Sequence, residues 1–269
     1  MTQKISYNAD GELRLEDDVV TVSKKIVDLL NRTGWNSADE TWTYASADDP
    51  TFTFTIAAFD ATAKYWAGMK IKLTDTGTQF GIITKVVFDD PGSTITIYMG
   101  TDYSLSGAAI TLPYYSTMKA PHGFPLDPIK WTVEVTDTTA RQQAAPTQNT
   151  WYNLGSITIS IPIGAWAVNY KVAIRVTDNA TATYVGGNVT LSTANDSESN
   201  ADFTTWMMFL TSTSDNKNVA QTIYNEVPLN IASKTSYYIN TKTSYAGIAD
   251  MYNANDQAKL IIRAVCAYL

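Results

Sequence analysis

Side chains that could carry out nucleophilic catalysis are few in this chain. It has one histidine, His122, in the stretch KAPHGFP, and one cysteine, Cys266. Ser/His/Asp and Cys/His mechanisms place an imidazole beside the nucleophile, so every such scheme here would have to use His122. The G-x-S-x-G turn of many serine hydrolases is absent from the sequence. Cys266 lies in the apolar run RAVCAYL, which predicts a small buried hydrophobic side chain instead of a nucleophile.

Metal and phosphate sites also lack their usual ligand patterns. A zinc site needs several histidines or cysteines around one ion. The acidic stretches NADGELRLEDD and TANDSESNAD could offer oxygen ligands, but neither has the Asp/Asn spacing and distal Glu of a calcium loop. VGGN is expected to be a short turn, and no G-x-x-x-x-G-K run appears. We therefore expect no catalytic residue set, no metal and no cofactor.

Glycoside hydrolysis is harder to exclude, because it needs only two carboxylates at a suitable distance. The chain has 26 Asp and Glu residues, so many pairs are conceivable. Glu134 and Glu226 lie in strand-like runs, with Glu134 at an alternating position of WTVEV. A lone glutamate on a strand usually faces solvent or a neighbouring cation. A glycan hydrolase that uses Glu134 and Glu226 therefore remains an alternative to a non-enzymatic protein.

Binding has more support than catalysis. The run KTSYYINTKTSYAGIADMY places Tyr237, Tyr238, Tyr245 and Tyr252 among Asn, Thr and Ser. Tyrosine and tryptophan are rigid and amphipathic, and they suit protein interfaces and the faces of sugars. Alternating tyrosines can equally line the rim of a core. A stand-alone carbohydrate-binding module is therefore the second alternative.

Composition limits the partners. Charged residues make up 17% of the 269 residues, the net charge is −7 and the pI is about 4.7. A nucleic-acid partner is not expected, because neutralising phosphates requires a basic surface. The first residues contain no apolar signal segment, and no uncharged apolar run approaches the roughly 20 residues that span a bilayer. We expect synthesis in the cytoplasm without a signal peptide, and no membrane insertion.

The first 45 residues are predicted to contain a short helix and an attachment segment. In Leu13–Leu30, apolar side chains recur at spacings of three and four, with acidic residues near the start. So narrow a stripe on about three turns is marginal alone, so the helix should pack on its own domain, on copies of itself or on another protein. The apolar positions are Val19, Val22, Ile26, Leu29 and Leu30.

From residue 46 the period changes to two, which is typical of strands. TFTFTI and GMKIKLT alternate, and turns such as DDPGS separate the runs. Residues 46–115 are predicted to form a small β-sandwich or barrel module, and the Pro/Gly-rich residues 116–130 a connector. The predicted core of the module consists of Phe52, Phe54, Ile71, Leu73, Ile82, Val86, Ile95 and Ile97.

Strand patterns resume and lengthen over residues 131–269. Eight β segments separated by polar loops predict an antiparallel, jelly-roll-like β-sandwich. The last segment is apolar almost to its end, so we expect it to be buried or packed against another subunit. The fold class predicted for the whole chain is mainly β.

The stretch from Trp42 to Pro125 resembles a module of minor structural proteins, of the tail or fibre type, in tailed bacteriophages and prophages of Gram-positive bacteria. Its order of motifs is an aromatic W-x-Y-x-S entry, three strand motifs and a Y-Y-S…P-x-G-F-P exit, over about a third of the chain. The matching residues are Trp42, Tyr44 and Ser46, then Gly68–Lys72, Phe80–Ile83, Thr94–Leu105 and Tyr114–Pro125.

This resemblance implies a non-enzymatic virion protein that forms a homotrimer. It further implies that the N-terminal segment joins other virion proteins and that the C-terminal sandwich faces a neighbouring virion protein or a glycan of the host surface. Three copies of the predicted helix could bury one another's apolar stripes and anchor such a trimer. In this interpretation the prolines of KAPHGFP, Pro121 and Pro125, stiffen the exit from the module, and His122 has no catalytic role.

Overall fold

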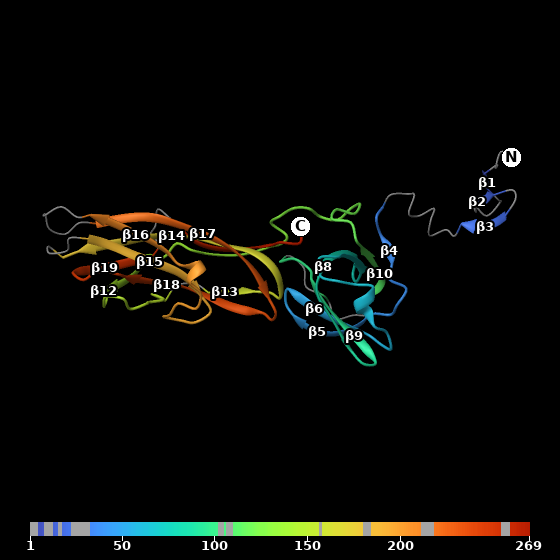
Figure 1. The fold of residues 1–269 in the computed structure, drawn as a ribbon, viewed down its shortest axis with the longest axis horizontal. Coiled ribbons are helices and arrows are strands. Elements are labelled where there is room, and N and C mark those ends of the chain that lie inside the picture. Colours follow the sequence, from blue (N-terminus) through green and yellow to red (C-terminus); the bar gives the residue numbers. More distant parts are fainter. Residues whose placement is uncertain are drawn as a thin grey trace. The chain divides into compact units, whose positions relative to one another are not determined.

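The computed structural model of the chain is mainly β, as the sequence predicts, and divides into two compact units (Figure 1). The first comprises residues 1–99 and 104–126, and the second comprises residues 100–103 and 127–269. The structure describes residues 5–7, 13–15, 18–22, 33–101, 105, 110–155, 158–179, 184–210, 218–253 and 259–269, with backbone only before residue 33 and at Leu210. Within these ranges the helical elements are two single 3-10 turns, η1 (Ala61–Ala63) and η2 (Ala201–Phe203).

The N-terminal helix predicted over Leu13–Leu30 is wrong for its first part. Strands β1 (Ile5–Tyr7), β2 (Leu13–Leu15) and β3 (Asp18–Val22) form a small antiparallel sheet in that order. β3 contains three valines and a threonine, whose branched side chains lose rotamer freedom in a helix and favour extended backbone. The rest of the predicted stripe, Ile26, Leu29 and Leu30, lies outside the described residues.

A seven-stranded antiparallel sheet forms the body of the first unit. Its order is β4-β10-β7-β8-β9-β6-β5, so the first and last strands of this sheet in the sequence, β4 and β10, lie side by side. The bounds are β4 Asn36–Ser37, β5 Thr43–Asp48, β6 Thr51–Ile56, β7 Lys70–Thr74, β8 Thr78–Asp89, β9 Gly92–Tyr98 and β10 Thr111–Ser116. The boundary predicted after residue 45 thus falls inside β5, and the sheet begins earlier than the alternation indicated.

The core of the first unit follows the alternation of its strands. The predicted core residues Phe52, Phe54, Ile71, Leu73, Ile82, Ile95 and Ile97 are buried, and Val86 is half-buried. Trp42 adds an aromatic cluster, with its ring 6.0 Å from that of Phe54 and 5.4 Å from that of Tyr65. The period-two pattern therefore identified the buried face correctly.

The stretch KAPHGFP folds back onto the residues just before β4. The backbone N–H of His122 donates to the carbonyl of Thr33 at 2.9 Å, and the indole N–H of Trp35 donates to the carbonyl of His122 at 2.8 Å. Phe124 is buried, with its ring 6.0 Å from that of Phe80. Residues 116–126 of the predicted connector therefore belong to the first unit, and the chain passes to the second unit at Asp127.

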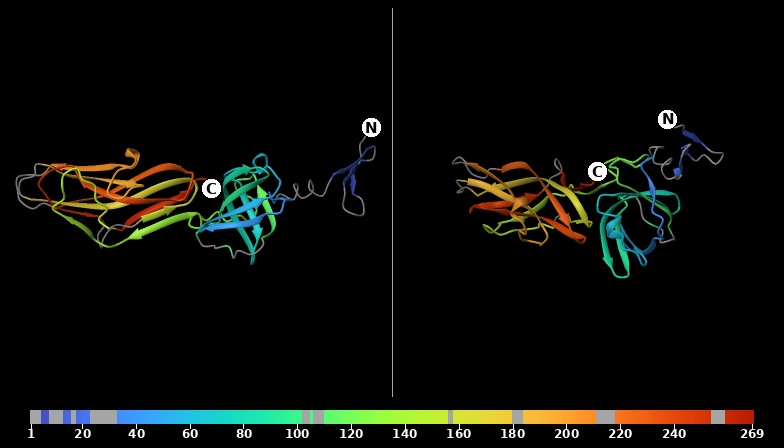
Figure 2. Two further views of the ribbon diagram at one scale, coloured as in Figure 1. Left: turned by 90° about the horizontal axis from the view of Figure 1, so that it is seen from below. Right: turned by 45° about the vertical axis from the view of Figure 1, so that its right-hand side comes forward.

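The second unit is an antiparallel β-sandwich (Figures 1 and 2). One sheet has the order β11-β20-β14-β19-β12, and β17 pairs with the other edge of β14 along 14 residue pairs. The other sheet has the order β13-β18-β15-β16. The bounds are β11 Thr132–Asp137, β12 Arg141–Ala144, β13 Thr158–Ile161, β14 Gly164–Asp178, β15 Tyr184–Ser192, β16 Thr205–Leu210, β17 Asn218–Ile231, β18 Thr235–Thr243, β19 Ile248–Asn253 and β20 Leu260–Cys266.

The two sheets of the sandwich are joined by apolar packing and by buried hydroxyls, one of which, on Thr241 of β18, donates to Oδ1 of Asn253 of β19 at 2.7 Å. Every second side chain of β14, from Trp166 to Val176, is buried. From the middle of that row the hydroxyl of Tyr170 reaches the carbonyl of Phe203 at 2.6 Å and that of Val189, in β15, at 3.1 Å. Burial raises the pKa of Tyr170. The terminal strand β20 is also buried at alternate positions, as the sequence predicted.

Candidate functional site

His122 contributes its backbone and not its imidazole to the described structure. Its side chain is exposed, whereas its N–H and carbonyl hold residues 33 and 35. Across the part of the chain that the structure describes, no three His, Cys, Asp or Glu side chains come together as a metal site. Those described residues also form no helix that is long and apolar enough to cross a bilayer.

Cys266 is a core residue, as its apolar run predicted. It is the last residue of β20, is 2% exposed, and lies opposite Trp166 of β14. Its N–H donates to the carbonyl of Trp131 at 3.1 Å, which closes the start of the sandwich against its last strand. A thiol in this position packs and is not presented to a substrate.

Glu134 and Glu226 lie in one cross-strand row, but on strands that are not neighbours. The strand registers pair Glu134 with Arg263, Arg263 with Asn169, and Asn169 with Glu226. Three steps of about 4.8 Å between strands separate the backbones of the two glutamates by about 14 Å. The carboxylates of glycosidases are about 5 to 9.5 Å apart.

Each glutamate is also turned toward a neighbour. Arg263 donates from Nε and Nη2 to Oε2 of Glu134, at 2.6 and 2.5 Å. Glu226 accepts from the hydroxyl of Tyr224 at 2.5 Å. These two carboxylates therefore do not form the acid and base pair that the hydrolase alternative requires.

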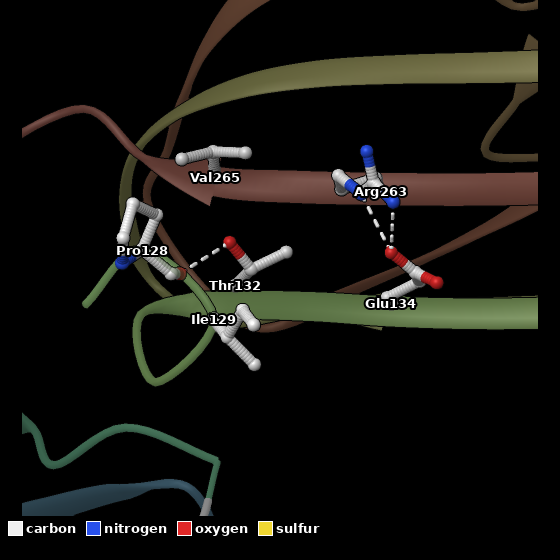
Figure 3. A pocket seen from close by; sticks show the side chains of 6 residues that line it. All are labelled: Pro128, Ile129, Thr132, Glu134, Arg263 and Val265. Carbon is white, nitrogen blue, oxygen red and sulfur yellow. Dashed lines mark hydrogen bonds and ion pairs between the residues drawn. The ribbon is translucent and has the colours of Figure 1, made fainter.

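The Glu134–Arg263 pair closes one end of a hollow of about 600 Å³ on the outside of β11 and β20 (Figure 3). Its other lining residues are Pro128, Ile129, Thr132 and Val265. Figure 3 shows the hydroxyl of Thr132 directed at the carbonyl of Pro128, to which it donates at 2.7 Å. Since the two charged lining residues neutralise each other, the hollow presents an apolar wall beside an ion pair.

The four tyrosines of KTSYYINTKTSYAGIADMY do not form one surface. Tyr237 points into the sandwich, where its ring lies 6.2 Å from that of Phe203. Tyr252 lies on the other sheet, where the guanidinium of Arg175 is 3.8 Å from its ring centre. Tyr238 and Tyr245 remain on the outside of the β18-β15-β16 sheet.

Tyr245 joins aromatic residues that the sequence analysis did not single out. Its ring stacks on that of Tyr184 with centroids 5.7 Å apart, and its hydroxyl approaches the sulfur of Met208 at 2.7 Å. Trp206 is exposed on the same side of β16. A signal was present in the run TTWMMFL, because apolar residues occupy both faces of a strand that forms a sheet edge.

Comparisons with known proteins give remote structural likenesses. No protein-family model and no curated protein sequence matches the chain. Latent PorU from Porphyromonas gingivalis is 8% identical, over 85% of this chain and 24% of PorU, with a TM-score of 0.28. The VP2 subviral particle of infectious bursal disease virus is 9% identical, over 98% of this chain and 68% of VP2, with a TM-score of 0.28. The structure of the Gt strain of that virus is 12% identical, over 96% of this chain and 63% of the viral chain, with a TM-score of 0.30. At these TM-scores no function is taken from the likeness.

Proposed function

We propose that this protein is a non-enzymatic structural component of a tailed-bacteriophage virion, fibre or tail-associated, that contacts the host cell surface. The observation that supports this most is the agreement between the resemblance and a folding unit. The motifs that resemble the phage module run from Trp42 to Pro125, and all of these residues except Gly100–Tyr103 belong to one compact unit, together with residues 1–41 and Leu126. The resemblance therefore spans β5 to β10, six of the seven strands of the main sheet of that unit.

The motif residues also explain why this unit holds together. Tyr44 of the entry motif packs edge-on against Phe54 at 6.2 Å, and Phe80 of the third motif packs against Phe124 of the exit motif. Gly68, which opens the second motif, has φ 97°, a conformation that favours glycine. Entry and exit motifs thus lie in the same structure, which fits a module inserted between an attachment segment and a sandwich.

Assembly as a homotrimer that joins other virion proteins through residues 1–45 belongs to the same proposal. The predicted helical stripe does not support the trimer, because its residues Val19 and Val22 lie in a strand. Light scattering of the purified full-length protein checks the trimer directly, and a chain that begins at Thr33 checks the role of the N-terminal segment. A monomer in both cases would overturn the trimer.

The virion assignment is tested on particles. Antibodies raised against the purified protein should label virions of the phage, or of the induced prophage, that encodes the chain, in electron micrographs of purified particles. Label that stays with the unassembled protein and never with particles would overturn the proposal. The same experiment shows whether the protein occupies the head, the neck or the tail, because the label marks its place.

The two alternatives separate from this proposal by simple assays. A hydrolase releases reducing ends from a glycan, and Glu134→Gln or Glu226→Gln would abolish that release. We expect no release, because the two carboxylates are held by Arg263 and Tyr224. A stand-alone carbohydrate-binding protein would bind glycan without ever being found on particles.

A further inference from the structure

The outside of the β18-β15-β16 sheet carries a cluster of exposed apolar side chains. Trp206 is 64% exposed, Met208 45% and Tyr184 42%. Together with Tyr245 and Trp151 they are called here the aromatic face. Monomeric surfaces seldom gather large apolar side chains in this way unless the patch binds something.

Strand register places the members of this face side by side. Trp206 of β16 lies opposite Asn188 of β15, which lies opposite Lys242 of β18. The next row joins Met208 to Gly186. Because neighbouring strands are about 4.8 Å apart, the row from Trp206 to Lys242 spans about 10 Å.

Gly186 of β15 places no side chain between these residues. A Cβ on Gly186 would lie 3.0 Å from the Tyr245 ring and 2.4 Å from the carbonyl oxygen of Met207. The absence of a side chain lets the Tyr245 ring lie over the backbone of β15 and stack on Tyr184. The ring is fixed further by its hydroxyl, which approaches the Met208 sulfur.

The polar groups around these rings are mostly uncharged. The hydroxyl of Ser244 donates to the amide oxygen of Asn188 at 2.5 Å, a bond in which the amide nitrogen takes no part. The backbone carbonyl of Ser244 accepts from the amide of Gln148 at 2.9 Å. The ammonium of Lys242 lies 4.4 Å from the centre of the Trp151 ring, so this cation already makes a cation–π contact with the indole.

We propose that the aromatic face binds a polysaccharide built of uncharged pyranose rings. The C–H faces of a pyranose are apolar and fit flat aromatic rings, whereas its hydroxyls project sideways toward amide and hydroxyl groups. A single lysine, covered by Trp151, gives an anionic polymer little to pair with, and the chain as a whole carries a net charge of −7. This proposal adds a binding site to the host-surface contact of the proposed function. It rests on the proposed function only for the place where the protein meets the glycan, namely the host cell surface.

The opposite sheet of the same unit provides a contrast. Among the described residues of its outer face, Tyr224 is comparably exposed, at 57%, and is bonded to Glu226. Tyr252 on that sheet is covered by the Arg175 guanidinium. Tyr224 is therefore a matched control: an exposed aromatic residue of the same sandwich, outside the aromatic face.

The test uses the full-length protein and a panel of neutral polysaccharides of different linkage, namely cellulose, chitin, dextran, mannan and galactan, with anionic alginate for comparison. Affinity gels and titration calorimetry measure the dissociation constants. We expect at least one neutral polymer to bind, Trp206→Ala and Tyr245→Ala each to weaken that binding about tenfold or more, and Tyr224→Ala to leave it unchanged. Binding should vary little with salt, because few charges take part. Far-UV circular dichroism and the thermal midpoint show that each variant is folded.

Three results would overturn the inference. They are no binding by the wild type to any neutral member of the panel, binding to alginate alone, or equal binding by Trp206→Ala and the wild type. A fourth would reassign the face: if Trp206→Ala lowers the oligomer mass in light scattering while no glycan binds, the face is an interface between copies of the chain. Each result is independent of the particle-labelling experiment, so failure of the site and failure of the virion assignment are distinguishable.

Discussion

Replacing Tyr170 by phenylalanine should destabilise the sandwich by about 2 kcal/mol. The ring stays buried, so the change removes only the hydroxyl. That hydroxyl lies 2.6 Å from the carbonyl of Phe203, 3.1 Å from that of Val189 and 3.2 Å from the hydroxyl of Thr205. Without it, a buried carbonyl loses its donor, and an unsatisfied buried polar group costs about 1–3 kcal/mol.

Urea unfolding of the full-length protein measures this loss. Because the chain has two units, the transition should be followed by hydrogen exchange of peptides from residues 127–269. Tyr224→Phe is the control, since its hydroxyl is exposed and should change the unfolding free energy by no more than about 0.5 kcal/mol. The thermal midpoint of the Tyr170→Phe sandwich should fall by about 6 °C.

Alkaline pH gives the same residue a second signature. Burial raises the pKa of Tyr170, so the folded state favours the neutral phenol. The stabilisation that comes from keeping this phenol neutral is fully present below about pH 10, where the tyrosine of the unfolded chain begins to ionise. It is lost as the pH rises toward the higher pKa of the folded state. Tyr170→Phe should flatten this decline. Equal stability of the Tyr170→Phe and Tyr224→Phe proteins at neutral pH would refute the reasoning.

Three other changes have definite expected outcomes. Glu40→Gln should cost the first unit about 1–2 kcal/mol in urea unfolding, because this half-buried carboxylate accepts from a lysine at 2.6 Å and a tyrosine at 2.7 Å. His122→Ala should leave the thermal midpoint of the first unit unchanged, since only the backbone of that residue makes the hydrogen bonds to Thr33 and Trp35. A fall of several degrees would contradict this. Burial acts to raise the pKa of Asp137, but hydrogen bonds from the Thr139 N–H and from Arg141 outweigh it and lower that pKa. The sandwich should therefore lose stability as the pH falls below about 4 toward the lowered pKa, and Asp137→Asn should remove part of that acid dependence in urea titrations.

Strand patterns were predictable because one face of each strand is buried. TFTFTI places Phe52, Phe54 and Ile56 in the core, and the last strand is buried from Leu260 to Cys266 at every second position. The predicted helix is wrong over residues 13–15 and 18–22, where the branched valines of β3 favour extended backbone. Its later residues lie outside the described ranges. β12 and β19 are not among the eight segments predicted for residues 131–269, because their residues show no clear apolar alternation. VGGN, expected to be a turn, lies inside β15.

The candidate site was harder to predict than the fold, because it depends on cross-strand register. Trp206, Asn188 and Lys242 come from three strands, and nothing in their sequence spacing shows that they form one row. The four tyrosines of one local run are, conversely, close in the sequence but separated in space. The run predicted a single surface, but the alternation of β18 turns Tyr237 inward and the next strand carries Tyr252 to the other sheet.

The backbone clasp at His122 has a mechanical consequence. It joins the chain before the first strand of the seven-stranded sheet to the chain after its last strand, through the bonds from His122 to Thr33 and from Trp35 to His122. If the protein is held through its first residues and pulled through its sandwich, tension reaches this clasp before it reaches the seven-stranded sheet. Once the clasp and the sheet open, the chain between those points can extend to roughly 300 Å. The first unit would then act as a store of length that absorbs a pull before the attachment at either end is broken.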